Sequence, residues 1–372
     1  MSLFWILNYF MVLVCAVTFS GIIIPKILLI SFRKKLFDVP DARKIHHSSV
    51  PRLGGIAFKP VIFFSVCLAL GIDIITGHGA MLAEVFTTNL LPEIMFLYCA
   101  VLPLYLVGIA DDLIGVKYRA KFVVQIICAI MLICGGVWIN NFDGILGIYE
   151  VPKWIGYPLT ILIVVFISNA INLIDGIDGL ASGLSSVAVF IYGSAFIINH
   201  QYLHAMMAFA TWGVLIPFFY YNVFGNAEKE KKIFMGDTGS LTIGILLSYL
   251  SIKLITCGNI PENEAGEVMA TAFAPLIIPC FDVVRVFIHR IKKGNNPFMP
   301  DKSHIHHKLL AIGMQLRPAM ISIVTISAIF SVMNIFLSKY ININILLVAD
   351  ILIWTIMNMW LTRKIHSRNI DF

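Results

Sequence analysis

The sequence predicts an all-α integral membrane protein that is polytopic, and three observations support this fold class. The 372 residues are 59% hydrophobic and 13% charged, with a mean hydropathy of +0.88, whereas a soluble domain carries roughly a quarter charged residues. Apolar runs of about 20 residues, the length that spans a bilayer as a helix, recur along the chain. The alternating short strands typical of an outer-membrane barrel do not occur in the sequence.

About eleven apolar runs are predicted to be transmembrane helices. The first has no basic residue before it and three basic residues after it, which indicates a retained span rather than a signal peptide. The runs lie near residues 3–30, 54–75, 93–110, 121–140, 154–172, 183–199, 205–222, 240–256, 267–290, 319–338 and 343–361.

Lysines and arginines divide unequally between alternate loops, and this predicts the orientation. They concentrate in the C-terminal tail and in the loops that lie on one side of the membrane. Because cytoplasmic loops carry such an excess, we expect the N-terminus outside and the C-terminus in the cytoplasm. Residues 1–372 then form a single transmembrane domain, with cytoplasmic loops at 31–53, 111–121, 173–182, 223–239 and 291–318.

The net charge of +6 does not indicate nucleic-acid binding, because the basic residues lie between spans and not along one soluble face. The seven cysteines contain no C-x-x-C pair, so neither a zinc motif nor a redox motif is predicted.

Four polar side chains directly follow the apolar run that ends near Ile167. Ionisable groups at the edge of a bilayer are costly, which favours a function for them. The last three share one face if the helix continues, whereas Gly176 and Gly179 favour a helix end and a bend. Either geometry supplies oxygen ligands that suit Mg²⁺ or Mn²⁺ better than zinc. The four residues are Asn169, Asn172, Asp175 and Asp178.

Two further carboxylate sites lie at the ends of apolar runs. Asp111 and Asp112 are adjacent, and two acids so close raise one pKa or recruit a cation; the alternative is a solvated helix end. Asp237 lies in Gly-Asp-Thr-Gly-Ser at residues 236–240, where a helix begins. Free backbone N–H groups and a carboxylate at a helix start suit a metal-bound phosphate.

Two cytoplasmic segments combine basic residues with histidines. The basic part of Asp38–Gly55 suits anionic lipid, but Gly54-Gly55 indicates close backbone packing or close approach of a ligand. His304, His306 and His307 follow Asp301, a poor spacing for zinc. We favour hydrogen bonding of these histidines to a pyrophosphate.

These motifs resemble the polyprenyl-phosphate N-acetylhexosamine-1-phosphate transferases (the WecA/MraY group) over nearly the whole chain. The resemblance rests on five segments in the same order: Asp41–Gly55, Asp111-Asp112, Asn169–Gly183, Phe234–Ser240 and the His-Ile-His-His segment from His304. Pro51-Arg52-Leu-Gly-Gly is similar to the hexosamine branch. The cell-wall MurNAc-pentapeptide enzymes usually carry Pro-Thr-Met-Gly-Gly there.

The resemblance implies a Mg²⁺-dependent transfer of N-acetylhexosamine-1-phosphate, with GlcNAc-1-phosphate expected, from a UDP-sugar to undecaprenyl phosphate. UMP leaves, and the lipid-linked product starts a surface polysaccharide. The implied location is the bacterial inner membrane, with the active site facing the cytoplasm. The expected partners are UDP-N-acetylhexosamine, undecaprenyl phosphate and membrane lipid, with a homodimer as an open alternative to a monomer.

The resemblance also implies roles for particular residues. The metal ligands are Asp237, Asn172 and Asp175, and Asp111 and Asp112 deprotonate or orient the lipid phosphate. With Asp175 and Asp178 they form the candidate catalytic set. The candidate substrate-binding residues are Arg43, Lys44, His46, Arg52, Arg119, Lys121, Asn222, His304, His306 and His307.

Two alternatives compete with this interpretation. A MurNAc-pentapeptide transferase performs the same chemistry on a different UDP-sugar. A membrane transporter of an anionic or lipid-linked solute should carry polar residues deep in its spans. Lys26, Lys253 and Asp350 are such residues, and the sequence offers no obvious partners for them.

Overall fold

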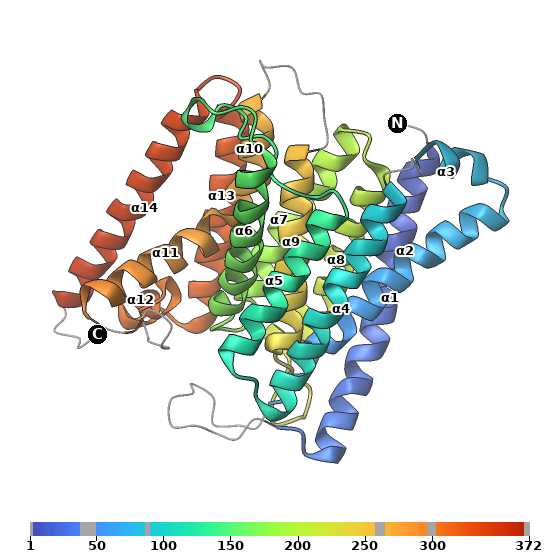
Figure 1. Ribbon diagram of the computed structural model, residues 1–372. Helices are drawn as coiled ribbons and strands as arrows, with labels where there is room; N and C mark the ends of the chain where they lie inside the picture. The colour runs from blue at the N-terminus through green and yellow to red at the C-terminus, as the bar shows by residue number, and fades with distance from the viewer. Residues whose placement is uncertain are drawn as a thin grey trace.

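The computed structural model describes residues 3–37, 50–85, 90–256, 265–294, 296 and 303–367. These residues form a bundle of helices that run up and down between two ends of the molecule (Figure 1). An isolated β-bridge joins Asn141 and Glu150, and the described residues contain no strand. The all-helical prediction is therefore confirmed.

Ten helical segments of the described chain are long and apolar enough to cross a membrane. The helices are α1 (Leu3–Lys34), α2 (Phe58–Ile75), α3 (Gly79–Val85), α4 (Leu90–Ile114), α5 (Tyr118–Cys134), α6 (Lys153–Ile174), α7 (Leu180–Ile198), α8 (Tyr202–Phe219), α9 (Gly236–Thr256), α10 (Ala265–Phe273), α11 (Ile277–Lys292), α12 (Ile305–Ala311), α13 (Leu316–Leu337) and α14 (Ile343–His366). Short 3-10 turns precede α2 (η1, Gly54–Ala57), α6 (η2, Ile145–Gly147) and α11 (η5, Ala274–Leu276), and a π-helical turn follows α8 (η3, Tyr220–Phe224).

The predicted span at 121–140 is displaced and shorter. Helix α5 has 17 residues and ends at Cys134, because Gly135 and Gly136 follow and Gly136 adopts a positive φ of 88°. A helix of 17 residues is about 25 Å long, near the lower limit for crossing a bilayer. The loop predicted at 111–121 is also shorter, since α4 continues to Ile114 and α5 begins at Tyr118.

Helix α9 is the centre of the bundle. In the most apolar 18-residue stretch of α9, 94% of the residues are buried inside the protein. The corresponding shares are 22% for α1 and 28% for α14. It packs against α4, α6, α7 and α10, so it is surrounded by other helices. Because α9 is buried on all sides, the position of its first turn is fixed. This turn begins at Gly236 and carries Asp237.

Glycines allow the start of α9 to lie unusually close to its neighbours. A Cβ at Gly55 would lie 2.0 Å from the backbone nitrogen of Gly239, and a Cβ at Gly108 would lie 2.5 Å from Cα of Thr238. The N–H groups of Gly54 and Gly55 donate to the carbonyls of Phe234 and Met235, both at 3.0 Å. The close backbone packing predicted for Gly54-Gly55 is confirmed.

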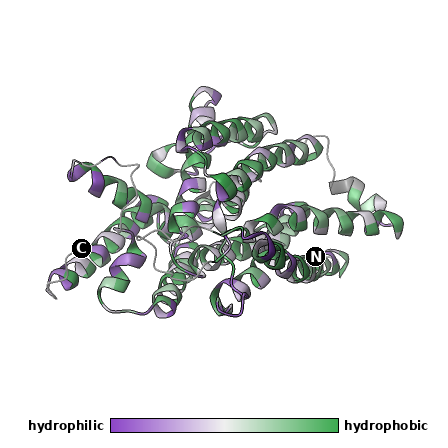
Figure 2. Cartoon of the chain, turned by 90° about the horizontal axis from the view of Figure 1, so that it is seen from below, coloured by the Kyte–Doolittle hydropathy of each residue, from purple (hydrophilic) through white to green (hydrophobic). Residues whose placement is uncertain are grey.

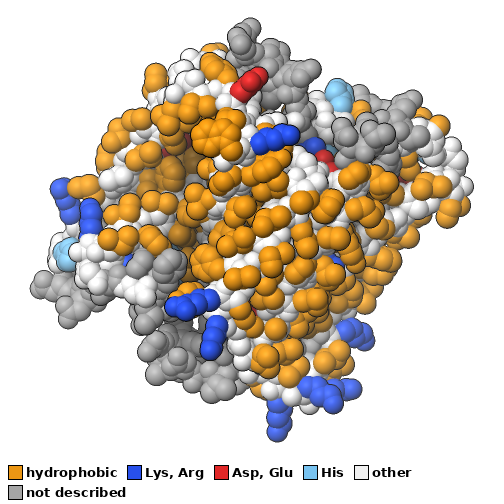
Figure 3. All heavy atoms as spheres, in the orientation of Figure 1, with side chains coloured by type: hydrophobic (Ala, Val, Ile, Leu, Met, Phe, Trp, Pro, Cys, Tyr) orange, Lys and Arg blue, Asp and Glu red, His pale blue; other side chains and the backbone are white. Residues whose placement is uncertain are grey.

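The outer surface matches a protein surrounded by lipid. Hydrophobic side chains cover the middle of the face in Figure 3, and most of the visible lysines and arginines lie toward its lower and left edges. Helices α1, α11 and α14 all carry basic residues in their last turn, and these turns lie at the lower end in Figure 1. Seen from below (Figure 2), hydrophilic residues also lie between the helices in the middle of the view.

Candidate active site

Three carboxylates from two separate helices converge at the lower end of the bundle. Asp111 and Asp112 lie in the last turn of α4, and Asp237 lies in the first turn of α9. One oxygen of each lies within 4.8 Å of one oxygen of each of the others. The structure therefore brings together acids that are 125 residues apart in the chain.

Lys121, in the first turn of α5, lies between two of these acids. Its Nζ is 2.6 Å from Oδ2 of Asp237 and 3.2 Å from Oδ2 of Asp111. All three side chains keep about a fifth of their surface accessible, at 21%, 22% and 17%. The site is thus open enough for a ligand to reach and closed enough to weaken solvent screening.

Both carboxylate oxygens of Asp112 accept hydrogen bonds from the start of α9. Its Oδ1 accepts a hydrogen bond from the N–H of Asp237 at 2.8 Å, and its Oδ2 accepts from the N–H and the hydroxyl of Thr238 at 2.9 and 2.6 Å. The first N–H groups of a helix have no partner within the helix. Asp112 therefore caps α9 and holds Asp237 in place. Asp111 accepts from the N–H of Val116 at 2.7 Å, pairs with Lys121 and also interacts with the carboxyl of Asp237.

The two asparagines of α6 connect it to its neighbours. Asn169 donates to Oε1 of Gln125 on α5 at 2.8 Å. Asn172 donates to the hydroxyl of Ser240 on α9 at 2.8 Å and also interacts with the carboxyl of Asp237. Of the two, Asn172 is the one that faces the carboxylate cluster.

Asp175 and Asp178 lie in the turn between α6 and α7, so the helix ends before them, as the glycines favoured. Burial, together with the charges of Asp237 and Asp178, raises the pKa of Asp175 to about 7, while Arg52 acts in the opposite direction. Asp178 pairs with Lys232, whose Nζ lies 2.5 Å from its Oδ2. Lys232 thereby holds this turn against the segment before α9.

Asn222 lies buried in the π-helical turn η3 and is engaged by two backbone segments. Its Oδ1 accepts from the N–H of Gly179 at 2.6 Å, and its Nδ2 donates to the carbonyl of Ile233 at 2.8 Å. Gly179 has a φ of 78°, a conformation that glycine adopts readily. In this structure Asn222 joins the Asp175–Asp178 turn to the segment before α9.

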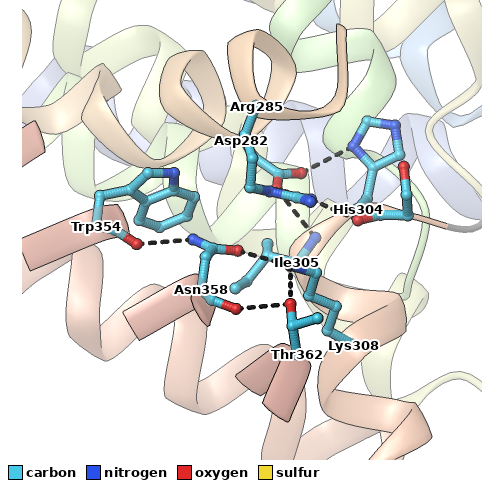
Figure 4. Close-up of polar contacts among 9 residues, drawn as sticks. Asp282, Arg285, His304, Ile305, Lys308, Trp354, Asn358 and Thr362 are labelled. Atoms are coloured by element: carbon cyan, nitrogen blue, oxygen red, sulfur yellow. Dashed lines mark hydrogen bonds and ion pairs between the residues drawn. The ribbon is translucent and has the colours of Figure 1, made fainter. Parts of the chain in front are cut away.

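The three histidines lie at the start of α12, and two of them are buried. His304 Nδ1 lies 2.8 Å from Oδ2 of Asp282, a fully buried residue of α11 (Figure 4). The ring of His306 lies against Gly176, next to Asp175, since a Cβ there would be 2.3 Å from its Nε2. Burial lowers the pKa of His306 to about 3, so its imidazole is neutral.

The remaining predicted residues lie outside this cluster or outside the described chain. Arg119 is exposed, and its Nε donates to the hydroxyl of Tyr118 at 3.3 Å. Arg52 is exposed and acts on Asp175 through its charge. Arg43, Lys44 and His46 lie outside the described residues.

The sequence interpretation missed Asp282 and Arg285, which hold the histidine segment. Both lie inside the predicted span 267–290, so the rule that ionisable residues in a span indicate function would have selected them. The sequence interpretation also missed Glu93, which lies in the predicted span 93–110 and which the same rule would have selected. Glu93 accepts from His204, Tyr249 and Lys253 at the opposite end of the bundle, which gives Lys253 its partner.

The cluster has the chemistry of a site for a hard divalent cation. Mg²⁺ and Mn²⁺ prefer carboxylate and amide oxygens, and Asp111, Asp237 and Asn172 offer these from three helices. The Lys121 ammonium between Asp111 and Asp237 shows that this position attracts positive charge. The residues therefore fit such an ion.

Fold and site together define a polytopic membrane protein with an acidic, cation-attracting site at one end of its bundle, and the comparisons identify the family. Residues 94–255 match the model of glycosyl transferase family 4. This region runs from within α4 to within α9 and includes each of the three clustered acids.

Curated relatives match over most of the chain. A probable undecaprenyl-phosphate N-acetylglucosaminyl 1-phosphate transferase of Bacillus subtilis is 33% identical over 327 residues, which cover 86% of this chain and 82% of the relative. The undecaprenyl-phosphate alpha-N-acetylglucosaminyl 1-phosphate transferases of Yersinia pestis and Salmonella typhi are 29% and 31% identical, covering 90% and 80% of this chain and 87% and 75% of those proteins. The chain belongs to this transferase family.

Proposed function

We propose that this protein transfers N-acetylglucosamine-1-phosphate from UDP-N-acetylglucosamine to undecaprenyl phosphate, releasing UMP. The names of the relatives support the lipid acceptor and the sugar. The observation that carries the proposal is the convergence of Asp111, Asp112 and Asp237 with Lys121 at one end of a membrane bundle. Such a site can receive a water-soluble nucleotide and a membrane lipid at the same time.

The substrates dictate what the site must do. Both carry phosphate, so they repel each other, and phosphoryl transfer depends chiefly on positioning and on neutralising charge. We propose that Asp237 and Asn172 hold one Mg²⁺ together with Asp175, whose carboxyl is close enough to interact with that of Asp237. Asp111, which also borders this position, is then left for the acceptor phosphate. When bound, this ion would supply positive charge that offsets the repulsion between the two phosphate-bearing substrates.

The protein's own residues have distinct tasks in this proposal. Lys121 is placed to contact a phosphate oxygen when Asp237 and Asp111 turn to other partners. Asp111 has fewer hydrogen-bond donors than Asp112, so it is better suited to accept a proton from, or orient, the acceptor phosphate. Asp112 keeps α9 and Asp237 in position.

Two observations support the proposed orientation in a bacterial inner membrane. The start of α1 and the end of α14 lie toward opposite ends of the bundle in Figure 1, which an odd number of crossings explains. The ten long helical segments of the described chain, together with α5, give eleven. The basic last turns of α1, α11 and α14 lie at the same end as the carboxylates. By the positive-inside rule this end faces the cytoplasm.

A donor panel tests the proposal. Purified protein in detergent receives undecaprenyl phosphate, Mg²⁺ and, in separate reactions, UDP-GlcNAc, UDP-GalNAc and UDP-MurNAc-pentapeptide, and UMP release is measured. We expect release with UDP-GlcNAc that depends on both lipid and metal. Release only with UDP-MurNAc-pentapeptide would support the cell-wall alternative, and no release with any donor would refute transfer.

A further inference from the structure

A fully buried carboxylate on a membrane helix organises the histidine segment. Asp282, on α11, has no accessible surface. Its Oδ2 lies 2.8 Å from Nδ1 of His304, and its Oδ1 accepts from the N–H of Ile305 at 3.1 Å and from Nη2 of Arg285 at 2.8 Å. A carboxylate is expensive to bury, and here it is compensated by three donors.

This arrangement fixes how His304 presents its ring. With Nδ1 directed at Asp282, the second ring nitrogen points away from it, as Figure 4 shows. The ring stacks on that of His306, with centroids 5.7 Å apart and planes inclined by 8°. His306 in turn lies against Gly176, beside Asp175. An unbroken series of contacts thus runs from Asp282 to the turn that carries Asp175.

The rest of the cluster holds the segment from the other side. Arg285 also donates to the carbonyl of Ser303, directly before His304. Lys308 donates to Thr362 at 3.0 Å and to Asn358 at 3.3 Å on α14, so it faces away from the carboxylate site. Asp282 is therefore the acid that acts on the histidine, while Lys308 anchors the following helix turn (Figure 4).

We propose that Asp282 is a positioning residue, which acts through His304 to bind the diphosphate of the nucleotide-sugar. A carboxylate that contacts one imidazole nitrogen fixes the orientation of the ring. His304 then holds its Nε2 toward a phosphate oxygen while its Nδ1 lies against Asp282. This inference rests on the proposed function, because it requires a nucleoside diphosphate as ligand.

Binding of UDP and of uridine, each measured with Mg²⁺ in detergent, separates this role from a structural one. Asp282→Asn should weaken UDP binding at least tenfold and leave uridine binding within twofold, because uridine lacks the diphosphate. Asp282→Asn/Arg285→Gln, which removes both charges of the buried pair, should show the same selective loss. Thr362→Val is the matched control, since it removes a contact of the same segment without touching Asp282 or His304, and both ligands should bind it as they bind the wild type.

A double-variant cycle tests whether Asp282 acts through His304. The UDP affinity of Asp282→Asn/His304→Ala should equal that of His304→Ala alone. Losses that add, or Asp282 variants that bind UDP as Thr362→Val does, would overturn the inference while leaving the proposed function intact. A wild-type protein that binds no UDP would overturn the proposed function, and this inference with it.

Discussion

Lys121 Nζ lies 2.6 Å from Oδ2 of Asp237, so the first turn of α5 is joined to the first turn of α9 by an ion pair. The same ammonium reaches Asp111 at the end of α4. One lysine thus links three helix ends that carry the candidate chemistry. Both Arg119 and Lys121 are candidates from the sequence, and the fold places Lys121 between these acids.

Lys121→Met should reduce transfer by about 100-fold or more, the usual effect of removing one preorganised charged donor from a phosphate or oxyanion site. Arg119→Met should have a much smaller effect, because Arg119 is exposed and bonds to its neighbour Tyr118. Initial rates of UMP release from the two purified variants provide the comparison. Equal losses would show that the loop as a whole, and not Lys121, supplies the charge.

Asp111 and Asp112 should differ in role: Asp111 takes part in the chemistry, whereas Asp112 positions the start of α9. Asp112→Ala removes two backbone bonds and one hydroxyl bond at the start of α9, and losing a helix cap costs about 0.5–2 kcal/mol. We therefore expect Asp112→Ala to unfold at a clearly lower temperature than Asp111→Ala, although both lose activity. Thermal unfolding in detergent measures this difference, and an Asp111→Ala protein that is equally destabilised would contradict the capping role.

Gly55→Ala should damage both stability and activity. The added methyl group would overlap the backbone of Gly239, which cannot move without shifting Asp237. Gly71→Ala in α2 is the matched control, because no atom outside the adjoining stretch of its own helix lies within 4 Å of its Cβ position, and alanine favours a helix. Unfolding temperature and UMP release should fall for the first variant and stay near wild type for the second; an active, stable Gly55→Ala protein would argue against this packing.

Because of Lys308, the free energy of unfolding should change with pH in the alkaline range. Burial, with the charge of Arg285, lowers the pKa of Lys308 to about 8, below its usual value of 10.5. Between these values the unfolded chain binds one more proton than the folded one, so the free energy of unfolding rises with pH. From pH 8 to pH 10 the unfolding temperature of the wild type should therefore rise relative to that of Lys308→Met. If the difference between the two unfolding temperatures stayed constant over this range, the lowered pKa of Lys308 would be refuted.

The sequence predicted the helical class and most spans because an apolar run of about 20 residues is typical of a transmembrane helix. It also selected Asp111, Asp175 and Asp237, since acids at membrane edges are costly and conspicuous. It misplaced α5, whose short apolar run ends at Gly135-Gly136, and it did not separate the capping role of Asp112 from the role of Asp111. That distinction depends on which backbone N–H groups lie opposite each carboxylate, and α9 supplies these from more than a hundred residues away.

The histidine segment shows the same limit. The pattern indicated polar chemistry, but it did not reveal that His304 bonds to Asp282, because the two residues lie on different helical segments. Only the packing of α11 against the start of α12 brings them together. Asn222 is similar, since its two backbone contacts depend on a π-helical turn that no local pattern indicated.

Direct measurement of metal binding tests the central claim, that acids from separate helix ends form one divalent-cation site. Mn²⁺, which prefers the same oxygen ligands as Mg²⁺, can be titrated by electron paramagnetic resonance in the presence of UDP. We expect one tightly bound ion per chain in the wild type and at least a tenfold weaker affinity in Asp237→Asn, with the fold unchanged. Unaltered Mn²⁺ affinity in Asp237→Asn would contradict it.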